Sequence, residues 1–356
     1  MSDETLKPCS GRTAGAMTIA AVAAVLASNL MPVDAAAETD TVNIYTTRQE
    51  VLIQPVLDAY RAATGAEVNV IFIKEGLVER LKSEGANSPA DVILTADVGY
   101  ILEADEAGLL QPIDSEILEA AIPVNYRQSD GRWYGFSLRA RPIMYSKERV
   151  DPSELSTYEE LADPKWKGRI CVRSSSNVYN QSLVSSMIVA DGAEATETWA
   201  KGFVANFARD PDGGDRDQIV AVAAGECDIA IANTYYLGGM LTSTDNPEQK
   251  AAAQKVAVFW PNQAGRGVHV NVTGGGVAAN APHKDAAVRF LEFLTTEDAQ
   301  RLFADVVNEY PIVVGIEPNE TIAAFGAYTP DAVALEELGG NVRREAVEIM
   351  DRAGWK

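Results

Sequence analysis

The spacing of apolar residues changes repeatedly over the first third of the chain. Residues 41–45 (TVNIY) and 67–73 (EVNVIFI) are rich in β-branched and aromatic residues, which favour strands. Residues 49–64 place apolar residues at helical spacing and end at Gly65. The alternation continues with a helix over 77–84, a strand over 91–94 and a helix over 98–107. Strands that alternate with helices predict an α/β fold with a parallel sheet covered on both faces.

Two long extended runs, 133–146 and 268–277, interrupt this alternation. Between them a second series predicts strands over 169–173 and 228–232 and helices over 181–190, 199–208 and 219–224. A helix over 284–294 and an amphipathic helical tail over 321–350 follow. Two β–α units joined by two extended strands predict a two-lobed binding fold, with a hinge and a ligand site between the lobes.

These patterns give the domain boundaries. We expect residues 41–137 and 276–320 to form lobe 1, residues 138–275 to form lobe 2, and residues 321–356 to form C-terminal helices that pack on the lobes. Residues 1–37 read as an export signal, because Lys7 and Arg12 precede an Ala-rich apolar stretch that ends near Ala35-Ala36-Ala37. A membrane anchor is the alternative, but the stretch is short for a bilayer span.

Composition narrows the function further. The chain has 356 residues, 47% of them hydrophobic, and a formal net charge of −21. Such an acidic surface argues against nucleic acid and against anionic membranes as partners. Removal of the signal would take Cys9 away and leave Cys171 and Cys227. These two form either a disulfide, as in an oxidising compartment, or two buried thiols.

Motifs of catalysis are missing from the sequence. It contains no G-x-S-x-G, no P-loop and no H-E-x-x-H, and its two histidines, His269 and His283, lie apart. The Ser174, Ser175 and Ser176 run lies between a predicted strand and a predicted helix, where hydroxyls and N–H groups either bind an anion or cap the helix. The chain therefore reads as a binding protein and not as an enzyme.

Tyrosines gather at the ends of predicted strands. Tyr235 and Tyr236 follow the strand DIAIA and the residues Asn233-Thr234, Tyr179 follows the strand RICVR, and Tyr45 ends TVNIY. Any one of these four, among 12 tyrosines, is explained by ordinary packing. Together they place four phenols at the edge of the sheets where α/β proteins bind ligands.

Phenol groups favour one kind of metal ion. Their pKa of about 10 makes them poor ligands until a strongly charged cation displaces the proton, which a hard ion such as Fe³⁺ does. Softer ions prefer Cys, Met or His. Four phenolates would leave Fe³⁺ with one excess negative charge, so we expect a cation nearby. The candidates are Arg48, Arg139 and Arg141, and surface ion pairs are the alternative use of these arginines.

At these residues the chain resembles the periplasmic iron-binding proteins of bacterial ABC-type iron importers. The resemblance extends over the mature chain and is carried by VNIYTTRQ (42–49), SPADVILTAD (88–97), WKGRICVRSSSNVYNQSLVSSMI (166–188) and GECDIAIANTYYLGGM (225–240). It implies a class II binding-protein fold, a periplasmic monomer, and a partner permease with its ATPase. It also implies Tyr45, Tyr179, Tyr235 and Tyr236 as iron ligands, and places Ser175 and Asn233 in segments that hold an anion in some relatives. Arg48 and Arg141 remain candidates for balancing the charge.

Two departures place the chain in a tyrosine-rich subgroup of that family. Some relatives have a histidine beside the first ligand and a glutamate in the segment that matches 95–97, whereas this chain has Ile44 and Ala96. Whether carbonate, another anion, water or an arginine completes the coordination shell is left open, as is Fe³⁺ against Fe²⁺. Two other functions are alternatives: an aromatic cleft for an organic cation such as a polyamine or thiamine, and a secreted transferase on the same fold.

Overall fold

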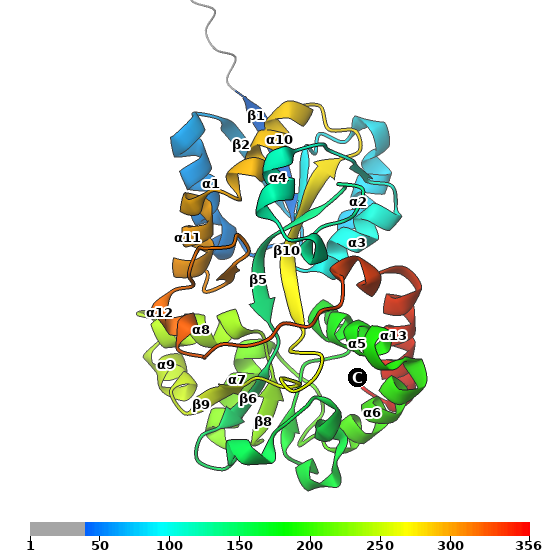
Figure 1. Ribbon diagram of the computed structural model, residues 1–356, viewed down its shortest axis with the longest axis vertical. Helices are drawn as coiled ribbons and strands as arrows, with labels where there is room; N and C mark the ends of the chain where they lie inside the picture. Colours follow the sequence, from blue (N-terminus) through cyan, green and yellow to red (C-terminus); the bar gives the residue numbers. More distant parts are fainter. Residues whose placement is uncertain (1–39) are drawn as a thin grey trace, which may run out of the picture. The chain divides into compact units, whose positions relative to one another are not determined.

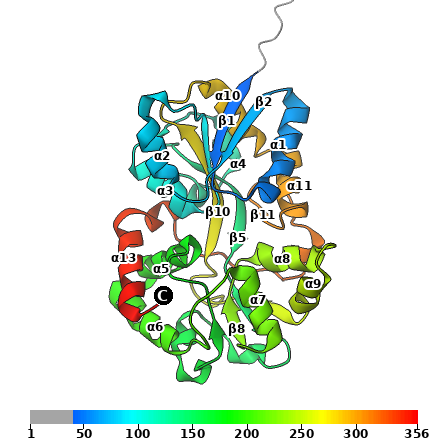
Figure 2. The same cartoon turned by 180° about the vertical axis from the view of Figure 1, so that it is seen from behind.

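The computed structural model describes residues 40–356, so the expected export signal over residues 1–37 lies outside the described part (Figure 1). Two β-sheets organise this part of the chain. We call lobe 1 the elements built on the seven-stranded sheet and lobe 2 those built on the four-stranded sheet. Figures 1 and 2 show helices on both faces of each sheet.

The sheet of lobe 1 has the order β11-β5-β10-β3-β1-β2, with β4 paired to β10. Its strands are β1 (Thr41–Thr46), β2 (Glu67–Phe72), β3 (Val92–Thr95), β4 (Leu110–Gln111), β5 (Tyr134–Ala140), β10 (Val270–Ala278) and β11 (Tyr310–Pro311). Helices α1 (Glu50–Thr64), α2 (Leu77–Glu84), α3 (Val98–Glu106), α4 (Glu116–Ala121), α10 (Lys284–Phe293) and α11 (Glu297–Asp305) pack around it. The predicted strands and helices of this region are confirmed to within one or two residues at each end.

The expectation of a parallel sheet is only half right. Strand β1 is parallel to β2 and β3, but β10 is antiparallel to β3, β4 and β5, and β11 is antiparallel to β5. Two of the antiparallel members, β5 and β10, come from the long extended runs. Strand β10 returns to the sheet from lobe 2 and not through a helical crossover within lobe 1, so nothing forces it to run parallel to β3.

Lobe 2 holds the four-stranded sheet in the order β7-β8-β6-β9. Its strands are β6 (Ile143–Ser146), β7 (Ile170–Cys171), β8 (Ile229–Ile231) and β9 (Val256–Phe259), and its helices are α5 (Val178–Asp191), α6 (Ala193–Ala205), α7 (Asp215–Ala224), α8 (Thr234–Thr242) and α9 (Pro247–Ala253). Strands β7 and β8 are parallel, whereas β6 runs antiparallel to β8 and β9. Both lobes therefore carry mixed sheets.

Each of the two extended runs forms strands, as the sequence predicted. The chain passes from β5 to the sheet of lobe 2 at β6 and returns from β9 to β10. Strands β5 and β10 pair with each other and run through the middle of the molecule (Figures 1 and 2). Residues 270–275, expected in lobe 2, hydrogen-bond to the lobe 1 sheet. The lobe boundaries and the action of these strands as a hinge stay predictions.

The C-terminal tail is not one long helix. Helix α12 (Glu320–Ala323) lies against α8, and α13 (Gly340–Ala353) packs on α5 and α6. Between them there is only the 3₁₀ turn Leu335–Leu338, because Gly326, Pro330 and Gly339 interrupt the amphipathic pattern. The last residues, for which the sequence suggested no role, matter for packing. Trp355 is buried against Trp199, Phe203 and Phe207 in the core of lobe 2.

The structure decides one question that the sequence left open. Cys171 and Cys227, both buried, form a disulfide with a Cα–Cα separation of 5.8 Å. The bond joins the last residue of β7 to the residues just before β8, the two strands whose carboxyl ends lead to the tyrosines. Over residues 40–356, no helix has both the length and the apolar character needed to cross a membrane.

Candidate metal centre

Two helix starts position three of the four candidate tyrosines. Tyr179 is the second residue of α5, whose N-terminus is capped by Asn177 through a 3.1 Å bond from the Tyr179 N–H. Tyr235 and Tyr236 are the second and third residues of α8. Each helix follows a short buried strand, β7 or β8, and these strands are parallel neighbours. Parallel neighbours end at the same edge of the sheet, so the two helix starts meet there.

The phenol groups of these tyrosines come together. The Tyr235 hydroxyl donates a hydrogen bond to the Tyr179 hydroxyl, with the oxygen atoms 3.2 Å apart. The ring of Tyr236 lies 4.2 Å from that of Tyr235, centroid to centroid, at an interplanar angle of 33°. Burial raises the pKa of Tyr179 and Tyr235 above the ordinary value, and the neighbouring Tyr236 raises both further, while the hydrogen bond from Tyr235 opposes the rise at Tyr179. Tyr179 and Tyr235 are thus adjacent phenols that resist ionisation by themselves.

Tyr45 has a different position and different partners. It lies inside strand β1 and not after it, and its hydroxyl donates to Glu84 at 3.0 Å. The Arg80 guanidinium lies over its ring, 4.9 Å from the centroid. Burial and the adjacent Glu84 raise the pKa of Tyr45, with Arg80 opposing. Within residues 40–356, no hydrogen bond or ring contact joins Tyr45 to the other three tyrosines.

A buried carboxylate organises the lobe 2 side of the site. We call Arg141, Arg173, Asp215 and Asn233 the Asp215 cluster. Asp215 accepts from Arg141 at 3.0 Å, from Arg173 at 3.3 Å and from the Asn233 N–H at 2.8 Å. Arg141 also donates to the side-chain oxygen of Asn233 at 3.0 Å. Both arginines lie over the Tyr179 ring, 5.7 and 5.4 Å from its centroid.

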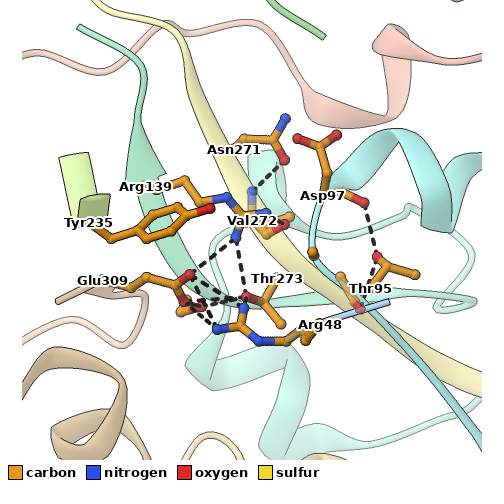
Figure 3. Close-up of polar contacts among 12 residues, drawn as sticks. Arg48, Thr95, Asp97, Arg139, Tyr235, Asn271, Val272, Thr273 and Glu309 are labelled. Carbon is orange, nitrogen blue, oxygen red and sulfur yellow. Dashed lines mark hydrogen bonds and ion pairs between the residues drawn. The ribbon is translucent and has the colours of Figure 1, made fainter. Parts of the chain in front are cut away.

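A second buried carboxylate lies on the lobe 1 side, where β5 and β10 run together (Figure 3). We call Arg48, Ser137, Arg139, Thr273 and Glu309 the Glu309 cluster. Arg48 approaches Glu309 to 3.3 Å and Arg139 approaches it to 3.7 Å, and Ser137 donates to it at 2.5 Å. Burial alone would raise the pKa of Glu309, but the two arginines hold it below its ordinary value.

Arg139 connects this cluster to the tyrosines. Figure 3 shows its side chain beside Tyr235, with the guanidinium donating to the Val272 carbonyl at 2.7 Å. Asp97, the N-cap of α3, is fully buried nearby and accepts from Ser182 of α5 at 2.8 Å, a contact between the two lobes. Burial raises the pKa of Asp97, while Arg139 opposes that rise. Guanidinium groups therefore flank the phenols from both lobes.

Other candidate groups are used structurally. The Ser175 N–H donates to the carbonyl of Lys356 at 3.0 Å, so the C-terminus occupies part of the serine loop. Ser174 and Ser176 join their hydroxyls at 2.9 Å. In the described residues, no three His, Cys, Asp or Glu side chains gather in a metal-binding arrangement. The phenol oxygens of Tyr179 and Tyr235 lie together at this edge of the sheets.

Comparison with known proteins identifies the family to which this fold belongs. Residues 44–301 match the bacterial extracellular solute-binding protein family. The chain belongs to that family. It is 52% identical over 324 residues to iron uptake protein A1 of Synechocystis, an alignment that covers 91% of this chain and 89% of that protein. It is 28% identical over 340 residues to the Fe(3+)-binding periplasmic protein of Serratia marcescens, covering 93% and 96% of the two chains.

Solved structures of similar proteins agree with the fold. A Trichodesmium protein (IdiA, FutA), solved with iron and citrate ligands, superposes with a TM-score of 0.84 at 50% identity, covering 89% of this chain and all of that one. A Bordetella ferric binding protein superposes with a TM-score of 0.81 at 42% identity, covering 89% and 99%. The predicted class II binding-protein fold is confirmed, and the family consists of transporter binding proteins, not enzymes.

The sequence singled out part of this group of residues and not the rest. It named the three tyrosines that meet, together with Arg48, Arg139, Arg141 and Asn233. It missed Asp215, Arg173 and Asp97. Arg173 ends the predicted strand 169–173 at the same edge as Tyr179, so the rule that singled out the tyrosines could have found it. Asp215 begins a helix and gives no such signal.

Proposed function

We propose that this protein is an extracytoplasmic carrier that binds ferric iron through the phenolates of Tyr179, Tyr235 and Tyr236. One observation carries the assignment: two helix starts bring three phenols together, with the oxygens of Tyr179 and Tyr235 3.2 Å apart. Small hard cations bind oxygen at about 2.1 Å, so adjacent ligands of an octahedral ion lie about 3 Å apart. The phenol spacing therefore suits a shared metal ion.

The chemistry of these ligands favours a trivalent ion. Burial raises the pKa of Tyr179 and Tyr235, so both hold their protons at neutral pH. Only a cation of high charge gains enough energy from a phenolate to displace them. Three phenolates neutralise Fe³⁺ completely, whereas Fe²⁺ would be left with an excess negative charge. The geometry thus favours ferric iron as the cargo.

The surrounding charge favours an anion as an additional ligand. Around the phenols the two lobes place five guanidinium groups, of Arg48, Arg139, Arg141, Arg173 and Arg216, against the three carboxylates of Asp97, Asp215 and Glu309. Because iron with three phenolates is neutral, this excess positive charge attracts a small anion such as carbonate or citrate. A similar Trichodesmium protein was solved with both iron and citrate.

The destination of the iron follows from the family. Its members serve transporters, and several relatives are named as iron uptake or ferric-binding proteins. We propose that the protein delivers iron to an inner-membrane ABC permease that is driven by its ATPase. It acts as a periplasmic monomer, stays out of the membrane after its signal is removed, and does not bind nucleic acid. An organic cation such as a polyamine fits less well, because it would need a carboxylate that is free to bind it. Asp97, Asp215 and Glu309 each already bind an arginine or a serine.

Iron titration of phenylalanine variants tests the proposal. Iron(III) is supplied as its citrate complex, free citrate competes, and the visible absorbance of phenolate bound to iron reports loading. Tyr179→Phe, Tyr235→Phe and Tyr236→Phe each remove one ligand oxygen and leave the ring. We expect each to weaken binding at least tenfold, about 1.4 kcal/mol. Tyr60→Phe, a buried tyrosine of the lobe 1 core, serves as the control and should bind normally.

Tyr45→Phe decides between three and four tyrosine ligands. In the structure its hydroxyl is held by Glu84, so we expect a loss of less than threefold. A loss equal to that of the other three would restore Tyr45 as a fourth ligand. An absence of visible absorbance in the unmodified protein, or unchanged affinity in all three site variants, would refute the tyrosine site.

A further inference from the structure

Asp215 is buried among groups that all lead to the tyrosines. It is the first residue of α7, directly after Gly213 and Gly214, and its side chain has no exposed surface. Its oxygens accept from two guanidinium groups and one backbone N–H, from Arg141, Arg173 and Asn233. These partners lie 74, 42 and 18 residues away along the chain. One carboxylate therefore joins three separate segments of lobe 2.

Each of these segments supports a tyrosine. Arg173 immediately precedes the serine loop that leads to Tyr179, and Arg141 and Arg173 both cover the Tyr179 ring. Asn233 is the N-cap residue of α8, the helix that begins with Thr234, Tyr235 and Tyr236. Its side chain makes no capping bond, because its oxygen accepts from Arg141 instead. The start of α8 is thus held from outside the helix, by the bond from the Asn233 N–H to Asp215.

We propose that Asp215 is the positioning residue of the iron site: it fixes the start of α8 and the two arginines against Tyr179, so that the phenols converge on one ion. This inference rests on the proposed function. It assigns to Asp215 a geometric role, and it names no contact between Asp215 and iron. The conformational order it supplies is present before the ligand arrives, which is how pre-organisation strengthens binding.

Charge alone would predict the opposite effect. The negative charge of Asp215 is one of the influences that raise the pKa of Tyr235, after burial and the neighbouring phenols, so it opposes formation of the phenolate. Its removal would also leave the site more positive and more attractive to an anion. On electrostatics alone, an Asp215 variant would therefore bind iron with its anion at least as tightly. A positioning role predicts weaker binding, so the sign of the change separates the two.

The test compares two substitutions with a matched control. Asp215→Ala removes all three contacts, whereas Asp215→Asn keeps an acceptor for the Asn233 N–H and loses the charge. Asp228→Asn is the control: Asp228 also joins two arginines in lobe 2, Arg149 and Arg169, each at 2.7 Å. It precedes β8, whereas Asn233 follows that strand, so its ion pairs lie at the opposite end.

Iron(III) citrate is titrated with free citrate as competitor, and the absorbance band of the fully loaded protein is recorded. We expect Asp215→Ala to lose at least tenfold in affinity and to show a shifted or weakened phenolate band even at saturation. Asp215→Asn should lie between Asp215→Ala and the unmodified protein, and Asp228→Asn should match the unmodified protein in both readouts. Circular dichroism and denaturant unfolding of the iron-free proteins show which variants fold. If Asp215→Ala does not fold, the affinity and the absorbance band of Asp215→Asn decide the test.

Two results would overturn the inference while leaving the proposed function intact. One is unchanged affinity and an unchanged band in both folded Asp215 variants. The other is tighter binding in Asp215→Asn, which would mean that charge outweighs position. If the unmodified protein itself shows no phenolate band, the proposed function fails, and that result is distinct from either of the two.

Discussion

Glu309 offers a stringent test of the buried charges between the lobes. Its carboxylate is almost fully buried where β5 and β10 run side by side, between Arg48 at 3.3 Å and Arg139 at 3.7 Å (Figure 3). Ser137 and Thr273 add hydrogen bonds at 2.5 and 3.4 Å. Glu309→Gln keeps the shape and one acceptor oxygen but removes the charge. Two guanidinium groups would then lack their shared partner.

The structure sets the size of the effect. Removing one partner of a buried ion pair costs about 3–5 kcal/mol, because the remaining charge stays buried without compensation. The amide oxygen of glutamine can still accept from Ser137, and Arg139 keeps its bonds to Val272 and Thr273. We therefore expect a loss near the lower limit, about 3 kcal/mol in the free energy of unfolding. Glu297→Gln, which breaks an exposed pair with Arg301, should cost no more than about 0.5 kcal/mol.

Denaturant unfolding of the iron-free protein measures both variants. A loss below about 1 kcal/mol for Glu309→Gln would refute the reasoning, since it would mean that water or a rearranged side chain compensates the arginines. The variant Arg48→Met combined with Glu309→Gln provides a second check. It removes one of the two uncompensated cations, so its loss should be smaller than the sum of the two single losses.

Two further predictions concern the disulfide and the protons of the site. Replacing Cys171 and Cys227 by Ala removes a bond between residues 56 positions apart. The unfolded chain then gains entropy, so we expect the free energy of unfolding to fall by about 4 kcal/mol. Denaturant unfolding of the variant and of the oxidised protein measures the difference, and a loss below about 1 kcal/mol would contradict the prediction. Iron affinity should fall as pH falls, because the pKa of Tyr179 and Tyr235 is raised and iron must displace their protons. With three phenols, three protons are displaced, so the affinity approaches a thousandfold fall per pH unit. Calorimetry in buffers of different ionisation enthalpy should count about three protons released on binding. An affinity that stays constant between pH 5 and 8 would exclude phenolate ligands.

The strands and helices were largely readable from local pattern. Helix α1 ends at Gly65, which adopts φ 71°, a conformation that glycine reaches without strain. The predicted strand 228–232, with Tyr235 and Tyr236 just after it, corresponds to β8 over 229–231, and the structure starts helix α8 at Thr234. The sheets were predicted less well. The direction of β10 depends on the lobe from which the chain returns, and no local pattern records that.

Part of the site could be predicted for the same reason. Tyr179, Tyr235 and Tyr236 lie at helix starts after parallel neighbouring strands, so a rule about strand ends brings them together. The same rule selected Tyr45, where strand β1 extends one residue beyond it and the hydroxyl donates to Glu84, 39 residues away in the sequence. Its role as a ligand stays a prediction.

By itself the sequence determined the α/β elements, and it predicted iron as the ligand from tyrosines at strand ends without Cys or His nearby. Only the tertiary structure decided which phenols meet, that Cys171 joins Cys227, and that Asp215 gathers Arg141 and Arg173 from distant segments. The physical reason is the range of the interactions. Helices and turns form between residues a few positions apart, so their signals are local. A buried carboxylate gains its partners only when the whole fold removes water from them, and that free energy belongs to the packed lobes as a unit.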